Sequence, residues 1–358
     1  MIRGANTNIA RTAGRDSFDL LTDMVRIPSV SREERELGAW LLSQLTHLGF
    51  TARQDEVGNV IAERGTGPRE IVLLGHMDTV PGIIPVRREG DRLFGRGTVD
   101  AKGPLAAAIS AVARRPPSAT HRCTIIAAVE EEGSSRGARH LRSRPAPDHL
   151  IILEPSGWDA VTLGYKGSMS VRYRLDQSVA HGAGPTASAA DGAIAFIRRV
   201  QDHATAFSQA RGMFDRLDAR VIDMHANHDG LRDVATLTIA FRLPLDYDID
   251  ALKATLEGWR GQAELEVDHA DAAVRAEKNT PLVRAFLEGI RVAGGTPRFK
   301  MKTGTSDMNI LVPIWECPAL AYGPGDSRLD HTPEEAIDRA DFERGVAVLT
   351  SAITRLAG

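Results

Sequence analysis

The architecture of this chain can be predicted outward from EIVLLGHMD, residues 70–78. Residues 71–74 form a short, continuous apolar run of the length expected for a strand that is buried on both faces. His76 and Asp78 follow directly, and the carboxyl end of a strand is where an open α/β sheet binds its ligands. The stretch therefore predicts one strand of such a sheet, with functional side chains at its end.

Strand-like runs of this kind alternate with helical patterns through the outer parts of the chain. Asp16 and Ser17 can cap a first helix, which Ile27-Pro28 would end. The spacing predicts further helices over residues 33–48, 104–113, 135–142, 282–293 and 341–356, and further strands over residues 59–62, 124–129, 150–153 and 319–322. This alternation predicts an α/β fold in which helices flank a central, mostly parallel sheet.

The pattern changes after Gly167 and indicates a second domain. Alternating strands are expected over residues 168–175, 235–243 and 263–267, and helices over residues 188–203 and 249–259. A chain of 358 residues is also longer than one hydrophobic core usually organises. We expect a catalytic, metal-binding domain at residues 1–167 and 271–358, interrupted by a smaller α+β lid or dimerisation domain at residues 168–270.

Composition excludes several classes of function. A net charge of -3 gives no reason to expect nucleic-acid binding, and no apolar run approaches the ~20 residues of a membrane helix. Cys123 and Cys317 are too few for a disulfide framework, and their spacing is not that of a metal site. Residues 1–15 have no apolar segment typical of a secretory signal. We therefore expect a cytoplasmic protein.

Histidine and acidic side chains gather after the predicted strands. Taken singly, such a histidine is more often structural, and a run of glutamates is more often a solvated helix start. Taken together at one edge of a sheet, they would be costly to bury without a cation. Imidazole and carboxylate ligands without thiolate suit zinc, cobalt or manganese. The residues concerned are His76, Asp78, Asp100, Glu130, Glu131, Glu132, Glu154 and His331.

The motifs around these residues closely resemble the di-zinc aminoacylase and carboxypeptidase family, which includes acetylornithine deacetylase, succinyl-diaminopimelate desuccinylase and the glutamate carboxypeptidases. The matching segments are GHMDTVP at 75–81, GRGTVDAKG at 95–103, EEE at 130–132 and Glu154-Pro155. The resemblance extends from Ile27 to Pro333. It implies a zinc-peptidase-like fold and hydrolysis of linear amide C–N bonds with two divalent metal ions, zinc first and cobalt as the alternative.

The resemblance also implies a role for each motif side chain. Glu131 would be the general base that takes a proton from the attacking water and passes it to the leaving amine. Asp78 is a further candidate catalytic residue, because alternate strand positions face the same way and its carboxylate can accept the other ring N–H of His76 and orient it. A non-proline cis peptide bond is expected between Asp100 and Ala101. The implied metal ligands are His76 and Glu154 for one ion, Glu132 and His331 for the other, and Asp100 as the bridge.

Further matches fall in the predicted lid and beside it. His181 would be a third catalytic residue, stabilising the oxyanion, although an exposed loop histidine is the alternative. Arg242 would bind the substrate carboxylate bidentately, with a surface strand arginine as the alternative. The turn at Gly304, Thr305 and Ser306 would bind substrate through backbone N–H groups.

Within the family, residues 165–167 and 302–309 look most like the branch that releases lysine or ornithine from the acidic carrier protein LysW in lysine and arginine biosynthesis. A deacetylase of N-acetyl-ornithine or N-acetyl-lysine is the alternative, and an inactive relative kept for binding or assembly is a third hypothesis. An acidic carrier needs a basic rim, and the candidates are Arg87, Arg88, Arg92 and Arg96, whose alternative is ordinary surface charge on a hairpin. We expect a homodimer formed through the lid, without nucleic-acid or membrane partners.

Overall fold

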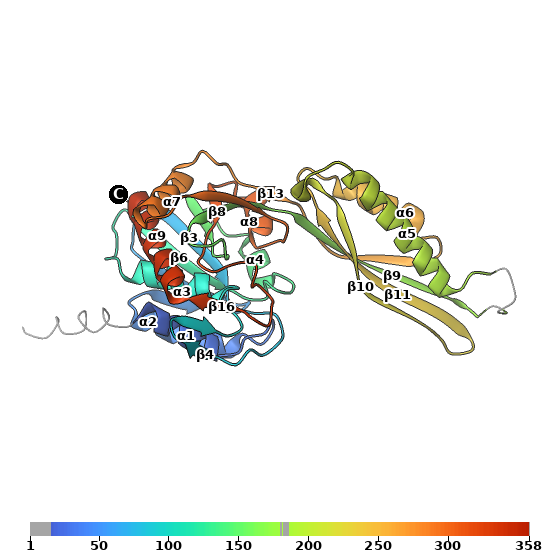
Figure 1. Cartoon of the computed structure of the whole chain (residues 1–358), viewed down its shortest axis with the longest axis horizontal. Coiled ribbons are helices and arrows are strands. Elements are labelled where there is room, and N and C mark those ends of the chain that lie inside the picture. Colours follow the sequence, from blue (N-terminus) through green and yellow to red (C-terminus); the bar gives the residue numbers. More distant parts are fainter. Residues whose placement is uncertain (1–15, 180, 182–185, 358) are drawn as a thin grey trace, which may run out of the picture. The chain divides into compact units, whose positions relative to one another are not determined.

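The computed structural model describes residues 16–179, 181 and 186–357 in two compact units (Figure 1). The outer unit comprises Met1–Gly164, Ala276–Lys300 and Ser306–Gly358, and the inserted unit comprises Tyr165–Arg275 and Met301–Thr305. The expectation for residues 1–15 lies outside the described residues. Within the described part of the chain, no helix has both the length and the apolar character needed to cross a membrane.

A mixed sheet lies at the centre of the outer unit. Its strands are β1 (Thr51–Gln54), β2 (Val60–Arg64), β3 (Arg69–His76), β6 (His121–Ala128), β7 (His149–Ile152), β8 (Ala160–Tyr165), β13 (Val274–Arg275), β14 (Arg298–Lys302) and β15 (Ala319–Ala321). Residues 274–275 of β13 and 301–302 of β14 fall within the ranges of the inserted unit. They lie in the order β1-β2-β6-β3-β7-β15-β8-β13, and β14 also pairs with β8. The middle strands β6, β3, β7 and β15 are parallel, as the sequence predicts, whereas β1, β2 and β8 pair antiparallel.

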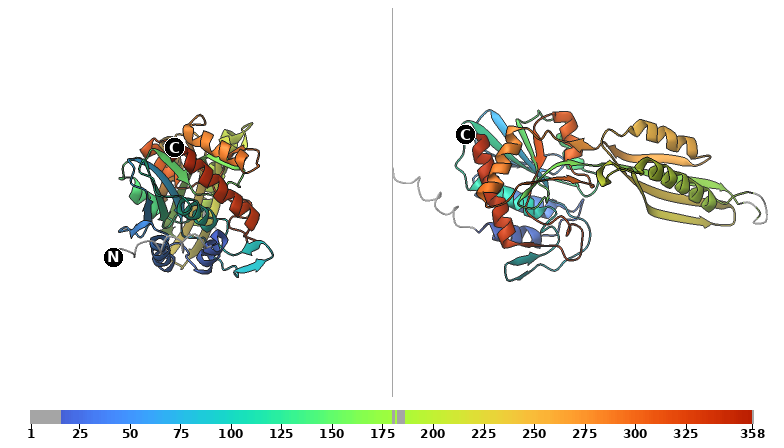
Figure 2. Two further views of the ribbon diagram at one scale, coloured as in Figure 1. Left: turned by 90° about the vertical axis from the view of Figure 1, so that its left-hand side faces the viewer. Right: turned by 45° about the horizontal axis from the view of Figure 1, so that its top comes forward.

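Helices cover this sheet, which explains why β3 is buried along all but its first residue. Helices α1, α3, α7 and α9 pack against one another, and α3 contacts β3 and β6, while α2 contacts β1 and β2 (Figures 1 and 2). Asp16 caps the first helix by accepting from the Phe18 amide, as expected. The helices are α1 (Ser17–Arg26), α2 (Arg35–His47), α3 (Lys102–Ala113), α4 (Arg136–Leu141), α7 (Pro281–Val292), α8 (Met308–Trp315) and α9 (Arg339–Ala357).

A small separate sheet joins two distant segments of the outer unit. It contains β4 (Arg87–Glu89), β5 (Arg92–Phe94) and β16 (Ala336–Asp338), with β5 in the middle and β16 antiparallel to it. The residues TPEE at 332–335 have the composition of a helix start, but no helix begins there. Residues 336–338 are held as a strand by β5, so that α9 begins only at Arg339.

The inserted unit is an antiparallel sheet with helices on one face (Figures 1 and 2). Its elements are β9 (Gly167–Ser178), α5 (Ala189–Ser208), the 3-10 helix η2 (Met213–Asp215), β10 (Asp218–His228), β11 (Arg232–Leu243), α6 (Ile249–Trp259) and β12 (Glu264–Asp271). The strand order is β10-β11-β9-β12. Its apolar core includes Tyr173, Phe196, Leu237 and Phe241, so this unit has a core of its own.

Candidate metal centre

The predicted metal ligands lie at the carboxyl ends of neighbouring parallel strands. His76 is the last residue of β3, Glu132 follows β6, and Glu154 follows β7. Asp100 lies in the turn before α3, and His331 lies in the loop between β15 and β16. Because these strands are parallel, their ends meet at one edge of the sheet, and residues far apart in the sequence come together there.

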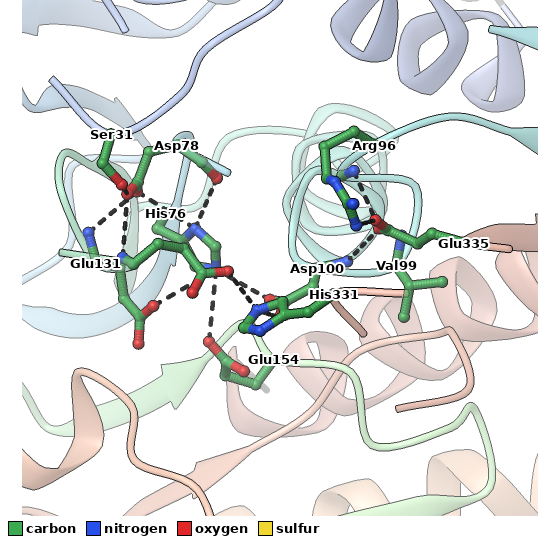
Figure 3. Close-up of polar contacts among 12 residues, drawn as sticks. Ser31, His76, Asp78, Arg96, Val99, Asp100, Glu131, Glu154, His331 and Glu335 are labelled. Carbon is green, nitrogen blue, oxygen red and sulfur yellow. Dashed lines mark hydrogen bonds and ion pairs between the residues drawn. The ribbon is translucent and has the colours of Figure 1, made fainter. Parts of the chain in front are cut away.

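The Asp100 carboxylate lies between two imidazoles (Figure 3). Its Oδ1 is 3.1 Å from His76 Nε2, and its Oδ2 is 3.0 Å from His331 Nε2. On the first side, Glu154 Oε1 is 3.7 Å from His76 Nε2. On the second side, Glu132 Oε1 is 2.8 Å from His331 Nε2. The donors thus form two groups that share one carboxylate.

These donor separations fit metal ligation. Two atoms bound at about 2.0–2.1 Å to one tetrahedral zinc lie roughly 3.3 Å apart. Donor atoms of His76, Asp100 and Glu154 lie within 4.8 Å of one another, as do those of Asp100, Glu132 and His331. Both groups combine imidazole nitrogen with carboxylate oxygen, the ligand types that zinc and cobalt accept.

The pKa values of the clustered side chains also indicate a site that favours positive charge. Hydrogen bonds to Asp100 and Glu132 raise the pKa of His331 to about 10. Burial raises the pKa of Glu131 well above its usual range; His76 opposes this, and neighbouring carboxylates including Glu154 add to it. The raised pKa values show that the clustered carboxylates favour a positive charge beside them. Two divalent ions would supply that charge, so the residues present fit two such ions.

Glu131 lies beside the two groups rather than at their centre. Its Oε2 is 4.0 Å from His76 Nε2, farther than the other donors stand from the imidazoles. Its donor atom also falls within 4.8 Å of donors of His76 and Glu132, so its nearness alone does not separate a base from a ligand. The longer distance favours a position from which Glu131 can reach a water molecule next to the ions.

Asp78 holds both the histidine and the glutamate segment. The Nδ1 of His76 is 3.0 Å from the main-chain oxygen of Asp78 and 3.4 Å from its carboxylate. Since both are acceptors, Nδ1 carries the proton and leaves Nε2 free to bind a metal. The carboxylate itself accepts from the amides of Glu131 and Glu132 at 3.0 Å each, and from Ser31 Oγ at 2.6 Å. Sequence patterns predicted only the link to the ring.

Glu130 lies in a local hydrogen-bond network. It accepts from Ser134 Oγ at 2.7 Å and from Arg136 Nε at 2.8 Å. Its φ of 58° lies in the left-handed region, which non-glycine residues seldom adopt. The turn that carries Glu131 and Glu132 is therefore fixed by the side chain before them. The peptide bond between Asp100 and Ala101 is cis, which confirms that expectation.

The remaining predicted site residues lie mainly in the inserted unit. His181 is exposed there, and its neighbours 180 and 182–185 lie outside the described residues. Arg242 is exposed at the end of β11 and donates to Thr305 Oγ1 at 3.0 Å. Gly304 has open space around it. The amide of Ser306 donates to the side chain of its neighbour Asn309 at 3.0 Å, so it is not available to bind an anion as the sequence suggested.

The four arginines of the predicted basic rim all contact other residues of the same chain. Arg87 pairs with Glu89 on the β4–β5 hairpin, and Arg88 reaches Asp19. Arg92 lies over the ring of Phe94. Arg96 forms an ion pair with Glu335, a buried residue that the sequence did not single out. These contacts favour the alternative, structural interpretation of the hairpin arginines.

Comparison with known proteins gives the family. The chain matches peptidase family M20/M25/M40 over residues 72–355. It is 47% identical over 350 residues to the LysW-lysine hydrolase of Deinococcus radiodurans, with 95% of this chain and 97% of that protein covered. It is 40% identical to a putative LysW-lysine/LysW-ornithine hydrolase of Thermococcus kodakarensis, covering 97% and 94%.

Solved structures support the fold. An M20 family metallo-carboxypeptidase from Sulfolobus solfataricus superposes with a TM-score of 0.79 at 18% identity, covering 96% of this chain and 99% of the other. An aminopeptidase PepT from Bacillus cereus superposes with a TM-score of 0.76 at 19% identity, covering 96% and 98%. The chain belongs to peptidase family M20/M25/M40, a family of hydrolases.

Proposed function

We propose that this M20-family chain is a metal-dependent amide hydrolase that releases lysine, or ornithine, from the carrier protein LysW in lysine or arginine biosynthesis. Relatives with the corresponding names match nearly the whole chain. The observation that carries the proposal is the shared position of Asp100 between His76 and His331, with Glu131 beside them. Inactive homologues kept for binding need no such complete set.

The donor set is suited to two divalent ions, zinc first and cobalt as the alternative. His76 and Glu154 would hold one, Glu132 and His331 the other, and Asp100 both. When bound, the two ions would lower the pKa of a water molecule and polarise the scissile carbonyl. Because Asp100 would contribute to both sites, both ions could act on the same amide.

The chain's own side chains then carry the proton. Glu131 takes a proton from the attacking water and gives it to the leaving amine, acting first as base and then as acid. Asp78 holds the amide of Glu131 and the ring of His76, so that the base and a ligand keep a fixed separation. We assign His181 to the oxyanion and Arg242, with Gly304 and Thr305 of the 304–306 turn, to substrate binding, on the family resemblance.

Parallel hydrolysis assays test the substrate. The protein, supplied with zinc or cobalt, is incubated with LysW-linked lysine, LysW-linked ornithine, N-acetyl-lysine and N-acetyl-ornithine. A preference of about a hundredfold in kcat/KM for a carrier-linked substrate, equal to ~2.7 kcal/mol of transition-state binding, supports the proposal. The opposite preference would identify a small-molecule deacetylase, and metal binding without any hydrolysis would favour an inactive relative.

We further propose that the protein is a cytoplasmic homodimer that associates through the inserted unit. Both cysteines are free, which suits a reducing compartment. The outer strands β10 and β12 expose the apolar side chains Ile222, Met224 and Val267. Exposed strand edges and apolar groups favour association. Sedimentation equilibrium tests this, and a monomer that keeps full activity at all concentrations would contradict it.

A further inference from the structure

Glu335 is a fully buried carboxylate that binds the turn carrying Asp100 (Figure 3). Its Oε1 accepts from three main-chain amides: Gly97 at 3.0 Å, Val99 at 2.9 Å and Asp100 itself at 3.1 Å. Its Oε2 accepts from Arg96 NH1 at 2.8 Å. Charge-assisted hydrogen bonds of this kind are stronger than neutral ones, and here every one of them ends on residues 96–100.

The same segment of chain also carries His331, four residues earlier. Immediately after Glu335, β16 pairs with β5, and the main-chain oxygen of Glu335 accepts from Gly95 at 3.2 Å. Arg96 NH1 donates in addition to the main-chain oxygen of Thr332 at 3.2 Å, directly next to His331. Two remote segments, 92–100 and 331–338, are therefore joined at Thr332, at Glu335 and along β16.

We propose that Glu335 is a positioning residue that fixes the shared carboxylate of Asp100 against the imidazole of His331. These two side chains approach to 3.0 Å, yet neither residue belongs to a helix or a strand. Asp100 precedes α3 and His331 stands in a loop with a φ of 60°. Their separation depends on the link between their segments, and the side chain of Glu335 contributes four hydrogen bonds to it. The inference rests on the proposed metal centre but not on the identity of the substrate.

The alternative is that Glu335 only satisfies buried amides and so stabilises the fold. The two roles differ in what they change. A purely stabilising carboxylate would affect the melting temperature of the metal-free protein and leave the affinity for metal unaltered in the folded state. A positioning carboxylate would lower metal affinity in a protein that is still folded, because ligand geometry is disturbed.

The experiment measures zinc affinity of the full-length Glu335→Gln protein by competition with a chelating dye, together with the visible spectrum of the cobalt-loaded form. Glutamine keeps the shape and one acceptor oxygen but places an N–H2 group against Arg96. We expect zinc affinity to fall about 10- to 100-fold, the range found when residues that orient metal ligands are replaced, and the cobalt spectrum to change. The melting temperature of the metal-free form serves as the measure of folding.

Glu70→Gln is the matched control. Glu70 is also a buried glutamate of the outer unit with arginine partners, but it lies near the amino end of β3, whereas His76 lies at its other end. We expect this control to lose thermal stability and to keep wild-type zinc affinity. Equal losses of affinity in both variants, or wild-type affinity and spectrum in Glu335→Gln, would overturn the positioning role.

If Glu335→Gln does not fold, Arg96→Lys takes its place. Lysine keeps the positive charge but not the planar guanidinium, whose NH1 donates to both Glu335 and Thr332 while its Nε donates to the main-chain oxygen of Gly82. We expect zinc affinity to fall at least about threefold, and unchanged affinity would again overturn the inference. A wild-type protein that binds no metal would instead refute the proposed function, so the two failures are distinguishable.

Discussion

Replacing Glu131 by glutamine should separate proton transfer from metal binding. The change keeps the volume of the side chain and removes only its ability to take up a proton. The amide of Glu131 remains bound to Asp78 at 3.0 Å, since that contact is made by the main chain. At 4.0 Å from His76 Nε2, the Glu131 carboxylate also stands farther from that imidazole than the carboxylates of Asp100, at 3.1 Å, and Glu154, at 3.7 Å. Both metals and the fold should therefore be retained.

The expected size of the effect follows from this role. Loss of a positioned general base lowers kcat by typically 10²–10⁴, which corresponds to about 2.7–5.5 kcal/mol in the activation barrier. KM should change little, because the base acts mainly in the transition state. Glu132 is adjacent but has the opposite role, with its Oε1 only 2.8 Å from His331 Nε2. Glu132→Gln should lose metal from one group of ligands, and excess metal should partly restore its activity.

The assay is elemental analysis of metal content beside steady-state kinetics for both variants. Two ions per chain and a strongly reduced kcat are expected for Glu131→Gln. If that variant lost metal while Glu132→Gln kept it and failed only in turnover, the two roles would be exchanged. Normal turnover by Glu131→Gln would refute the proposed mechanism.

Three further outcomes are expected. Chelation of the metal should abolish hydrolysis and lower the melting temperature, because an ion present at a free concentration of a hundred times its Kd stabilises the fold by about 2.7 kcal/mol. Adding zinc should restore both, and an active metal-free protein would contradict the proposal. Burial raises the pKa of Glu70, but Thr124 and the charges of Arg144 and Arg122 outweigh this and leave it below 4.5. The ionised Glu70 therefore stabilises the fold above pH 4.5, and this stabilisation is lost as the pH falls through the lowered pKa. The difference in melting temperature between wild type and Glu70→Gln should shrink in acid, and a difference that stays constant with pH would be inconsistent with this. Arg242→Met should lower kcat/KM about 10- to 100-fold, mainly through KM, if it binds the substrate carboxylate, and unchanged kinetics would assign it to the surface.

The sequence predicted the ligand cluster because its members follow buried strands directly. His76 and Glu154 each come at the end of an apolar run, and the order of strands then brings them to one edge. Ser31 and Glu335 could not be found in this way. Their partners, Asp78 and the turn before α3, are remote in sequence, and TPEE at 332–335 has the composition of an ordinary helix start.

Two of the longer strands that the sequence did not predict, β8 and β10, were missed for identifiable reasons. β10 (DARVIDMHANH) is exposed along most of its length, so no alternation of buried and exposed apolar residues marks it. β8 (AVTLGY) is buried throughout, but Ala160, Thr162 and Gly164 break its apolar run. Periodicity detects strands with one buried face, and these two strands have either almost no buried face or small residues at alternate positions.

The position of β15 has a consequence for synthesis of the chain. β7 and β8 follow one another in sequence, yet β15 lies between them and comes from residues 319–321. During translation, the entire inserted unit leaves the ribosome before that strand does. At about 5–20 residues per second, this is a delay on the order of ten seconds. The inserted unit, whose sheet and helices come almost entirely from one continuous stretch, can fold first, while the surrounding sheet waits for its missing strand and the metal cluster for His331.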